Sequence, residues 1–231
     1  MKRSKITILL AIVLGMTFHS CLDLEPQDQL GGKNMWTSVN DYKQFANTFY
    51  SWTRDFSSVV YDGTHSDKRS DLITYQSYNE FSRGINSIPS SDANYTDNYK
   101  HIRRTNLLLQ NAEAYAKPED IKQYIGEAYF FRAYSYFDLL QLYGDVIITK
   151  KPLDITDPEM KVKRNDRSEV VDLIIDDLNH AVENLPAFKE LTTEEEGRIS
   201  KEGAQAFLSR VALYEGTWQK SRNGNQNTQR D

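Results

Sequence analysis

The stretch GEAYFFRAYSYFDLLQLYGD, residues 126–145, predicts a helix that is apolar on nearly every side. Small residues lie between aromatic residues, as in helices inside a helical array, where small residues let a neighbouring backbone approach closely. Arg132 is the cation in the middle of the stretch. The pair Tyr143-Gly144 predicts the end of the helix, because glycine often takes the left-handed conformation at that position. We therefore expect the other helices to pack around this one.

Further amphipathic helices are expected on both sides of this stretch. Apolar residues recur at intervals of three and four, which predicts helices with one buried face. These helices cover residues 39–54, 98–116, 167–185 and 200–218, and Pro118 opens the central helix. Residues that cap helix N-termini support three of the starts: Ser38 with Asp41, Asp166 with Glu169, and Ser200.

The chain contains an internal repeat. Residues 128–136 read Ala-Tyr-Phe-x-Arg-Ala-x-x-Tyr, and residues 206–214 read Ala-Phe-Leu-x-Arg-Val-x-x-Tyr. The helices that precede these two segments also align weakly. Two similar helical hairpins predict tetratricopeptide-like repeats, here joined by long irregular loops. The expected fold class is therefore all-α.

Composition excludes several classes of function. The chain has 28 Lys and Arg residues against 33 Asp and Glu residues, a net charge of −5, and no basic stripe. A nucleic-acid partner is therefore not expected. With Cys21 as the single cysteine and four scattered histidines, we expect no disulfide, no metal site and no cofactor. Asp62, Asp67 and Asp71 lack calcium-loop spacing and are interpreted as turn residues.

Residues 1–21 predict a bacterial lipoprotein signal peptide. Three basic residues precede an apolar run at 6–18, which is shorter than the roughly 20 residues that span a bilayer. The run leads into Ser20-Cys21, which resembles a lipoprotein cleavage site, so we expect Cys21 to carry acyl chains that anchor the protein. The polar, Pro- and Gly-containing residues 22–37 then read as an extended tether.

Residues 56–97 show no sustained periodicity and combine aromatic with amide side chains. Tyr78 and Tyr95 lie in this segment close to several asparagines. Aromatic faces and amides together suit a carbohydrate, because the ring covers the C–H face of a sugar and the amides bind its hydroxyls. The alternative is that these rings only hold the loop against the helices, and composition leaves both readings open.

Four motifs resemble the SusD/RagB-like outer-membrane nutrient-binding lipoproteins of Bacteroidetes. They are Ser-Cys-Leu-Asp-Leu-Glu-Pro at 20–26, Tyr-x-x-Ile-x-x-x-Asn at 99–106, Glu-Ala-x-x-x-Arg-Ala-x-x-Tyr-Phe-x-Leu-x-x-x-Tyr-Gly-Asp-Val at 127–146, and Ala-x-Ala-x-Leu-x-Arg-Val-x-Leu-Tyr-x-Gly-x-Trp at 204–218. Members of this family continue well beyond the length of this chain. The resemblance therefore implies an N-terminal portion of a SusD-like fold over 38–218, followed by a disordered tail over 219–231.

The resemblance also implies a function. It predicts a cell-surface lipoprotein of the outer membrane that captures oligosaccharides for a SusC-like TonB-dependent transporter, without catalysis. A ligand-stacking aromatic followed three residues later by Asn matches Tyr95 and Asn98, and Tyr78 is a further candidate from composition alone. A peptide ligand, or a scaffold role without a ligand, are the alternatives. A glycoside hydrolase would need two paired carboxylates, and no motif supplies them.

Overall fold

Helices form nearly all of the regular structure. The computed structural model describes residues 35–54, 83–85, 87–154 and 156–228. Its α-helices are α2 (Val39–Asn47), α3 (Ala93–Glu113), α4 (Lys122–Tyr143), α5 (Arg167–Asn184) and α6 (Lys201–Thr228). Short 3₁₀ turns connect them: η1 (Thr48–Trp52), η4 (Pro118–Ile121), η5 (Pro158–Lys161), η6 (Phe188–Glu190) and η7 (Thr193–Glu195). The β-type pairing in the described ranges is one isolated bridge between Val146 and Asn165. The all-α prediction is confirmed.

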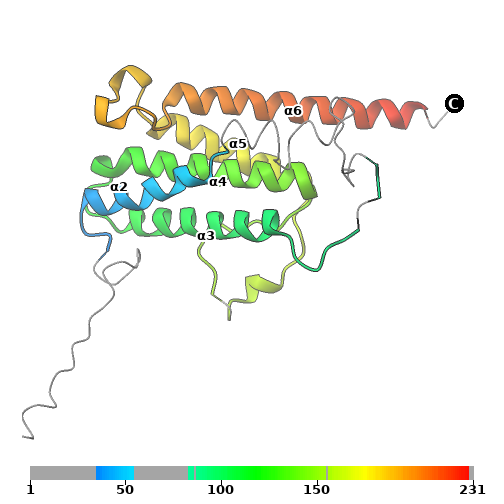
Figure 1. The fold of residues 1–231 in the computed structure, drawn as a ribbon, viewed down its shortest axis with the longest axis horizontal. Coiled ribbons are helices and arrows are strands. Elements are labelled where there is room, and N and C mark those ends of the chain that lie inside the picture. The colour runs from blue at the N-terminus through cyan, green and yellow to red at the C-terminus, as the bar shows by residue number, and fades with distance from the viewer. Residues whose placement is uncertain (1–34, 55–82, 86, 155, 229–231) are drawn as a thin grey trace, which may run out of the picture. The chain divides into compact units, whose positions relative to one another are not determined.

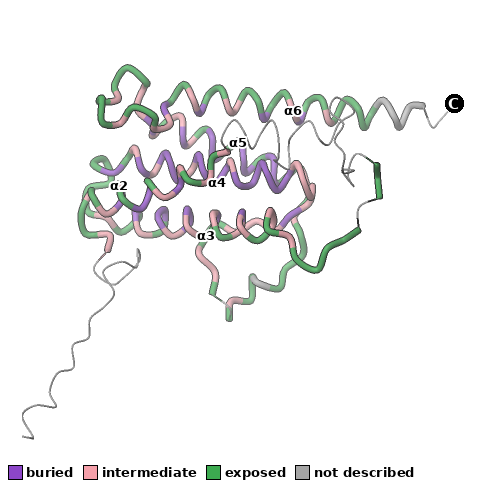
Figure 2. The backbone as a smooth tube through the Cα atoms, in the orientation of Figure 1, coloured by how far each residue is buried: buried purple, intermediate pink, exposed green. Residues whose placement is uncertain are grey.

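Helix α4 lies at the centre of the described helices. It runs between α3 and α5, and α6 lies along the other side of α5 (Figure 1). The consecutive pairs α3–α4 and α5–α6 are the two helical hairpins of the tetratricopeptide-like prediction. Most residues of α4 are buried, whereas α6 is exposed along much of its length (Figure 2). Phe131, Tyr136 and Leu139 of α4 are at most 1% exposed. The prediction that residues 126–145 organise the core is confirmed.

The close approach of α4 to the end of α5 explains why residue 126 is a glycine. A Cβ atom at Gly126 would lie 2.9 Å from the Leu185 Cγ, so a larger residue would clash with the end of α5. Gly144 follows the last residue of α4 with φ 71, and its N–H donates to the Leu140 carbonyl at 3.1 Å. The predicted helix end is therefore present, and glycine supplies the positive φ that it requires.

Ion pairs between arginine and carboxylate side chains link the helices inside the core. The buried carboxylates lie within hydrogen-bond distance of guanidinium groups, which offsets part of the cost of removing the charges from water. The pairs are Arg132 with Asp177 at 2.6 Å, Arg198 with Glu127 at 2.7 Å, Arg167 with Glu215 at 2.7 Å, and Arg54 with Asp138.

The first helix starts as predicted and ends differently. Ser38 and Asp41 form the predicted capping box, since the Ser38 N–H donates to the Asp41 carboxylate at 2.8 Å and the Asp41 N–H donates to the Ser38 hydroxyl at 3.3 Å. The α-helical geometry stops at Asn47, and the 3₁₀ turn η1 carries the chain on to Trp52.

Helix α3 begins five residues before the predicted start at Asn98. Asp92 caps it, because its carboxylate accepts the Asn94 N–H at 2.9 Å. Residues 93–97 therefore belong to a helix and not to the irregular segment to which the sequence assigned them. That assignment was wrong because a local cap outweighed the polar composition of this stretch.

The end of α6 also differs from the prediction. We expected the last helix to stop near Trp218 and a disordered tail to follow over 219–231, but α6 continues to Thr228. The ten additional residues contain no proline, so their backbone can continue the intrahelical hydrogen bonds. The Gln219 amide also donates to the Glu215 carboxylate one turn earlier, at 3.1 Å.

Candidate functional site

A groove lies between the first half of α3 and the segment that follows α4. We call it the α3 groove, and its volume is about 410 Å³. This size lies within the range of small-ligand pockets. Its lining combines aromatic and aliphatic side chains with charged ones: Tyr95, Thr96, Tyr99, Lys100, Arg103, Ile147, Thr149, Lys151, Leu153 and Glu159.

Two tyrosines form the aromatic part of the α3 groove. Tyr95 and Tyr99 lie one helical turn apart, and their ring centroids are 4.8 Å from each other. Tyr143, at the end of α4, meets the Tyr95 ring edge-on at 5.2 Å. The Tyr143 hydroxyl donates to the Asp92 carboxylate at 2.7 Å, which ties the end of α4 to the start of α3. The half-buried Tyr95 is thereby held between two other rings.

Charged side chains surround these rings. Lys151 forms an ion pair with Glu159 at 2.7 Å, and Lys100 forms one with Asp97 at 2.7 Å. The Arg103 Nε donates to the Leu153 carbonyl at 3.3 Å, so it also joins α3 to the opposite side of the groove. Exposed ion pairs of this kind contribute little stability, so breaking them costs little. Their donors and acceptors are therefore available to a polar ligand.

The phenol of Tyr99 links α3 to the segment after α4, on the opposite side of the groove. Its hydroxyl donates to the Ile147 carbonyl at 2.8 Å and accepts the Ile147 N–H at 2.9 Å. Burial, together with the neighbouring Tyr95, raises the pKa of Tyr99 above its usual range. The hydroxyl therefore keeps its proton and serves as donor and acceptor at once.

The candidate ligand residues from the sequence do not come together in this groove. Tyr95 lines it, but Asn98 is 7% exposed and its amide donates to the Asn94 carbonyl within α3 at 2.7 Å. Asn98 also hydrogen-bonds the Asp138 side chain on α4, so it faces the core between the two helices. Tyr78 and Cys21 lie outside the described residues. Direct sugar contact by Asn98 therefore has no support in its position.

Sequence reasoning missed several groove residues. Tyr99 belongs to the motif at 99–106, and its spacing of four from Tyr95 would have placed both rings on one helical face. Arg103 continues the same spacing. Thr149 and Lys151 gave no comparable signal, because they lie in a loop whose path depends on contacts with α3 and α4.

The charged groups of the groove do not form a recognisable catalytic pair. Glu159 is the carboxylate among its lining residues, and it is already paired with Lys151. Glycoside hydrolysis commonly uses two carboxylates that flank the scissile bond. Across the described ranges, no group of three or more His, Cys, Asp or Glu side chains is placed to hold a metal ion. None of the helices in the same ranges has the length and apolarity needed to cross a membrane.

Comparison with known proteins gives one consistent family. Residues 22–213 match the model of a SusD-like family described as "Starch-binding associating with outer membrane". Among curated proteins, the chain is 28% identical to SusD-like protein P38 of Formosa agariphila over 92% of its length, and 28% identical to SusD-like protein P2 of the same organism over 96%. The matches cover 42% and 45% of these two relatives, so the chain spans less than half of their length.

Solved structures agree with these matches. A SusD-like protein from Bacteroides fragilis superposes with a TM-score of 0.67 at 27% identity, over 84% of this chain and 38% of that one. A laminarin-binding SusD-like protein superposes with a TM-score of 0.53 at 30% identity, over 60% of this chain and 30% of that one. The helical arrangement described above is therefore shared with these proteins.

Proposed function

The chain belongs to the SusD-like family, and on this premise we propose that it is a non-catalytic glycan-binding protein. The observation that carries the proposal is the α3 groove, where the paired rings of Tyr95 and Tyr99 lie beside charged groups. A ring can cover the C–H face of a sugar, while Lys100, Arg103 and Glu159 can bond its hydroxyls. The name of the laminarin-binding relative agrees with a carbohydrate ligand.

The proposed cellular setting follows from the N-terminal sequence and the family. Acyl chains on Cys21 would hold the protein at the outer membrane, and residues 22–37 would let the helical part extend from it. The protein would sit on the cell surface and pass oligosaccharides to a SusC-like TonB-dependent transporter. Substitution of the lipidated residue, Cys21→Ala, should move the protein from the membrane pellet to the soluble fraction. Retention in the pellet would contradict the anchor.

Ligand binding is best tested by thermal unfolding followed by calorimetric titration. Residues 22–231 are heated alone and with laminari-oligosaccharides, malto-oligosaccharides and short peptides. A ligand that binds only the native state raises the unfolding temperature by mass action. An oligosaccharide that does so supports the proposal. A rise with peptides alone would favour the peptide-binding alternative, and no rise with any ligand would leave the scaffold role.

Substitution of Tyr95 locates the binding site. We expect Tyr95→Ala to weaken oligosaccharide binding roughly three- to tenfold, since the contact of an aromatic ring is worth about 0.5–1.5 kcal/mol. Tyr95→Phe is the matched control, because it keeps the ring and should keep most of the affinity. Equal affinities of the alanine variant and the unaltered protein would place the ligand elsewhere.

A further inference from the structure

Residues 147–151, which we call the groove wall, follow α4 and form one side of the α3 groove. Side chains from two helices hold the backbone of this wall. The Tyr136 hydroxyl accepts the Thr149 N–H at 2.8 Å and donates to the Thr149 carbonyl at 3.3 Å. The Tyr99 hydroxyl likewise donates to the Ile147 carbonyl and accepts the Ile147 N–H. The wall is a loop, yet its path is fixed by phenol groups that each bond both backbone groups of one residue.

Asn106 of α3 supplies the third contact to the groove wall. Its amide Nδ2 donates to the Thr149 carbonyl at 2.9 Å and to the Lys151 carbonyl at 3.3 Å. Asn106 is 1% exposed, so water cannot replace either bond easily. Both acceptors belong to residues that line the groove, and a shift of their backbone would therefore move the lining itself.

Arg132 decides which way the Asn106 amide points. The Arg132 Nη1 donates to the Asn106 Oδ1 at 2.8 Å. Arginine can only donate, so the amide oxygen must face the guanidinium and the amide nitrogen must face the wall. The opposite orientation would place a donor against a donor and an oxygen against two carbonyl oxygens. Arg132 thus determines that α3 donates hydrogen bonds, through the Asn106 amide, to the carbonyls of the groove wall.

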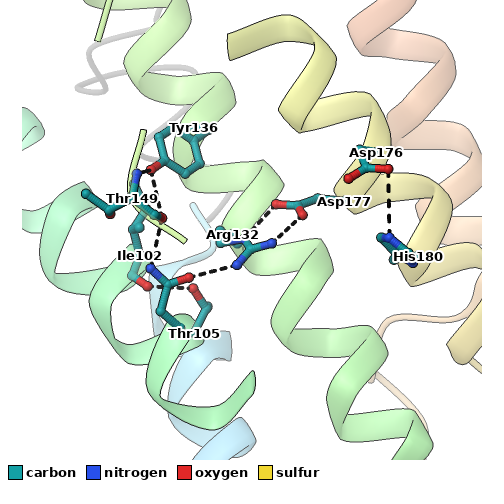
Figure 3. Close-up of polar contacts among 9 residues, drawn as sticks. Ile102, Thr105, Arg132, Tyr136, Thr149, Asp176, Asp177 and His180 are labelled. Atoms are coloured by element: carbon teal, nitrogen blue, oxygen red, sulfur yellow. Dashed lines mark hydrogen bonds and ion pairs between the residues drawn. The ribbon is translucent and has the colours of Figure 1, made fainter. Parts of the chain in front are cut away.

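Asp177 of α5 in turn holds the Arg132 guanidinium. The Arg132 Nε donates to one carboxylate oxygen at 2.8 Å and Nη2 donates to the other at 2.6 Å (Figure 3). Burial opposes the charge of Arg132, but the bonds and the charge of Asp177 outweigh it and raise the pKa of the guanidinium. Such a two-point contact fixes the plane of the guanidinium. Its remaining N–H groups can then face Asn106 in a single direction.

We propose that the buried chain Asp177–Arg132–Asn106, together with Tyr136, positions the groove wall and thereby sets the affinity of the α3 groove for its ligand. The affinity part rests on the proposed glycan-binding function. Arg132, Asn106 and Tyr136 are positioning residues, because they touch the wall or its supports and none of them lines the groove. The same bonds also serve stability, so the test needs a measurement that a purely structural role would leave unchanged.

The informative substitutions are Asn106→Asp and Tyr136→Phe. Asn106→Asp keeps an acceptor for Arg132 but removes the donor to the wall carbonyls, and Tyr136→Phe removes the hydroxyl while keeping the buried ring. Asn111→Asp is the matched control, because the Asn111 amide donates to Leu107 within α3 at 2.7 Å. The two measurements are amide hydrogen exchange at 147–151 and calorimetric titration with the oligosaccharide that raises the unfolding temperature.

We expect both substitutions to speed amide exchange in the groove wall at least about tenfold while α5 stays protected, because the wall opens locally without global unfolding. Oligosaccharide affinity should fall by a similar factor, and Asn111→Asp should change neither quantity. Unchanged exchange in the wall would overturn the proposal, and so would faster exchange with unchanged affinity. If the unaltered protein binds no oligosaccharide, the proposed function fails, whereas exchange in the variants still decides whether this network holds the wall.

Discussion

The two helical hairpins carry a similar sequence pattern in different surroundings. Arg132 in α4 and Arg210 in α6 occupy matching positions of the internal repeat. Arg132 is 5% exposed and bonded to Asp177, whereas Arg210 is exposed and forms neither a hydrogen bond nor an ion pair with any described residue. The repeat position of the fully buried Ser135 is taken in α6 by Leu213, which is 73% exposed.

The difference shows that neighbouring helices, and not the repeat sequence, decide the environment of each residue. Helix α4 contacts α2, α3 and α5. The ring of Phe137 in α4 also contacts the rings of Phe207 and Tyr214 in α6. Helix α6 has its principal backbone contacts with α5 alone. The sequence similarity therefore predicts two comparable hairpins, but it cannot predict which copy of the arginine becomes the centre of a buried network.

The largest expected difference between the hairpins concerns their arginines. Arg132→Ala leaves the Asp177 carboxylate buried without its partner, which should lower the free energy of unfolding by about 3–5 kcal/mol. Arg210→Ala should change it by no more than about 0.5 kcal/mol, as is usual for exposed positions. Urea unfolding of both variants measures this difference. Similar losses in the two variants would show that the environments of the two arginines are alike.

The next largest expected difference concerns glycine-to-alanine substitutions, which should change the free energy of unfolding in opposite directions in α4 and α6. Gly126→Ala in α4 places a methyl group against Leu185 and should lower the free energy of unfolding by about 1–3 kcal/mol. Gly216→Ala in α6 meets no atom within 4 Å and should raise it by about 0.5–1 kcal/mol, because alanine favours the helix. Thermal unfolding checks both. A stabilising Gly126→Ala would mean that α5 can retreat from α4.

The smallest expected difference between the hairpins concerns the pH dependence of stability. It involves two histidines that each stack on an aromatic ring. The ring centroid of His101 in α3 lies 4.1 Å from that of Trp52, and the ring centroid of His180 in α5 lies 4.8 Å from that of Tyr129. Burial lowers the pKa of His101 to about 4, and the positive charges of Arg104 and Lys100 act in the same direction against Asp97. The native state thus binds His101's proton more weakly than the unfolded chain does.

This difference predicts a loss of stability in acid. Between the unfolded pKa near 6.5 and the folded pKa near 4, the unfolded chain binds more protons, so stability falls as pH decreases through this window. His101→Phe keeps the ring stacking and should remove about 1 kcal/mol of that loss, after allowance for partial exposure. His180→Phe is the control. Identical stability-against-pH curves for the unaltered protein and His101→Phe would contradict the prediction.

Much of the fold could be predicted because its signals are local. Capping pairs such as Ser38 with Asp41 act within one turn, and the apolar recurrence of the central stretch depends only on helix geometry. The prediction failed where local signals were weak or misleading. Asp92 started α3 early inside a polar segment, and nothing in residues 219–228 ended α6.

The candidate site was less predictable, because it joins segments that are distant in the sequence. Tyr95, a ligand residue predicted from composition and motif, lines the groove, whereas the predicted ligand residue Asn98 faces the core between α3 and α4. Spacings of three and of four both lie near one helical face, so spacing alone did not separate Tyr99, which lines the groove, from Asn98, which is buried.

Local sequence patterns predict the helices, most of their starts, the central position of α4 and the resemblance to the SusD-like family, because periodicity, caps and motifs are properties of neighbouring residues. Packing between distant segments places Arg132 between Asp177 and Asn106, and it bonds the loop after α4 to α3 and α4 to form a groove. These contacts join residues 13 to 48 positions apart. Their partners are selected by helix packing, and no local pattern records that choice.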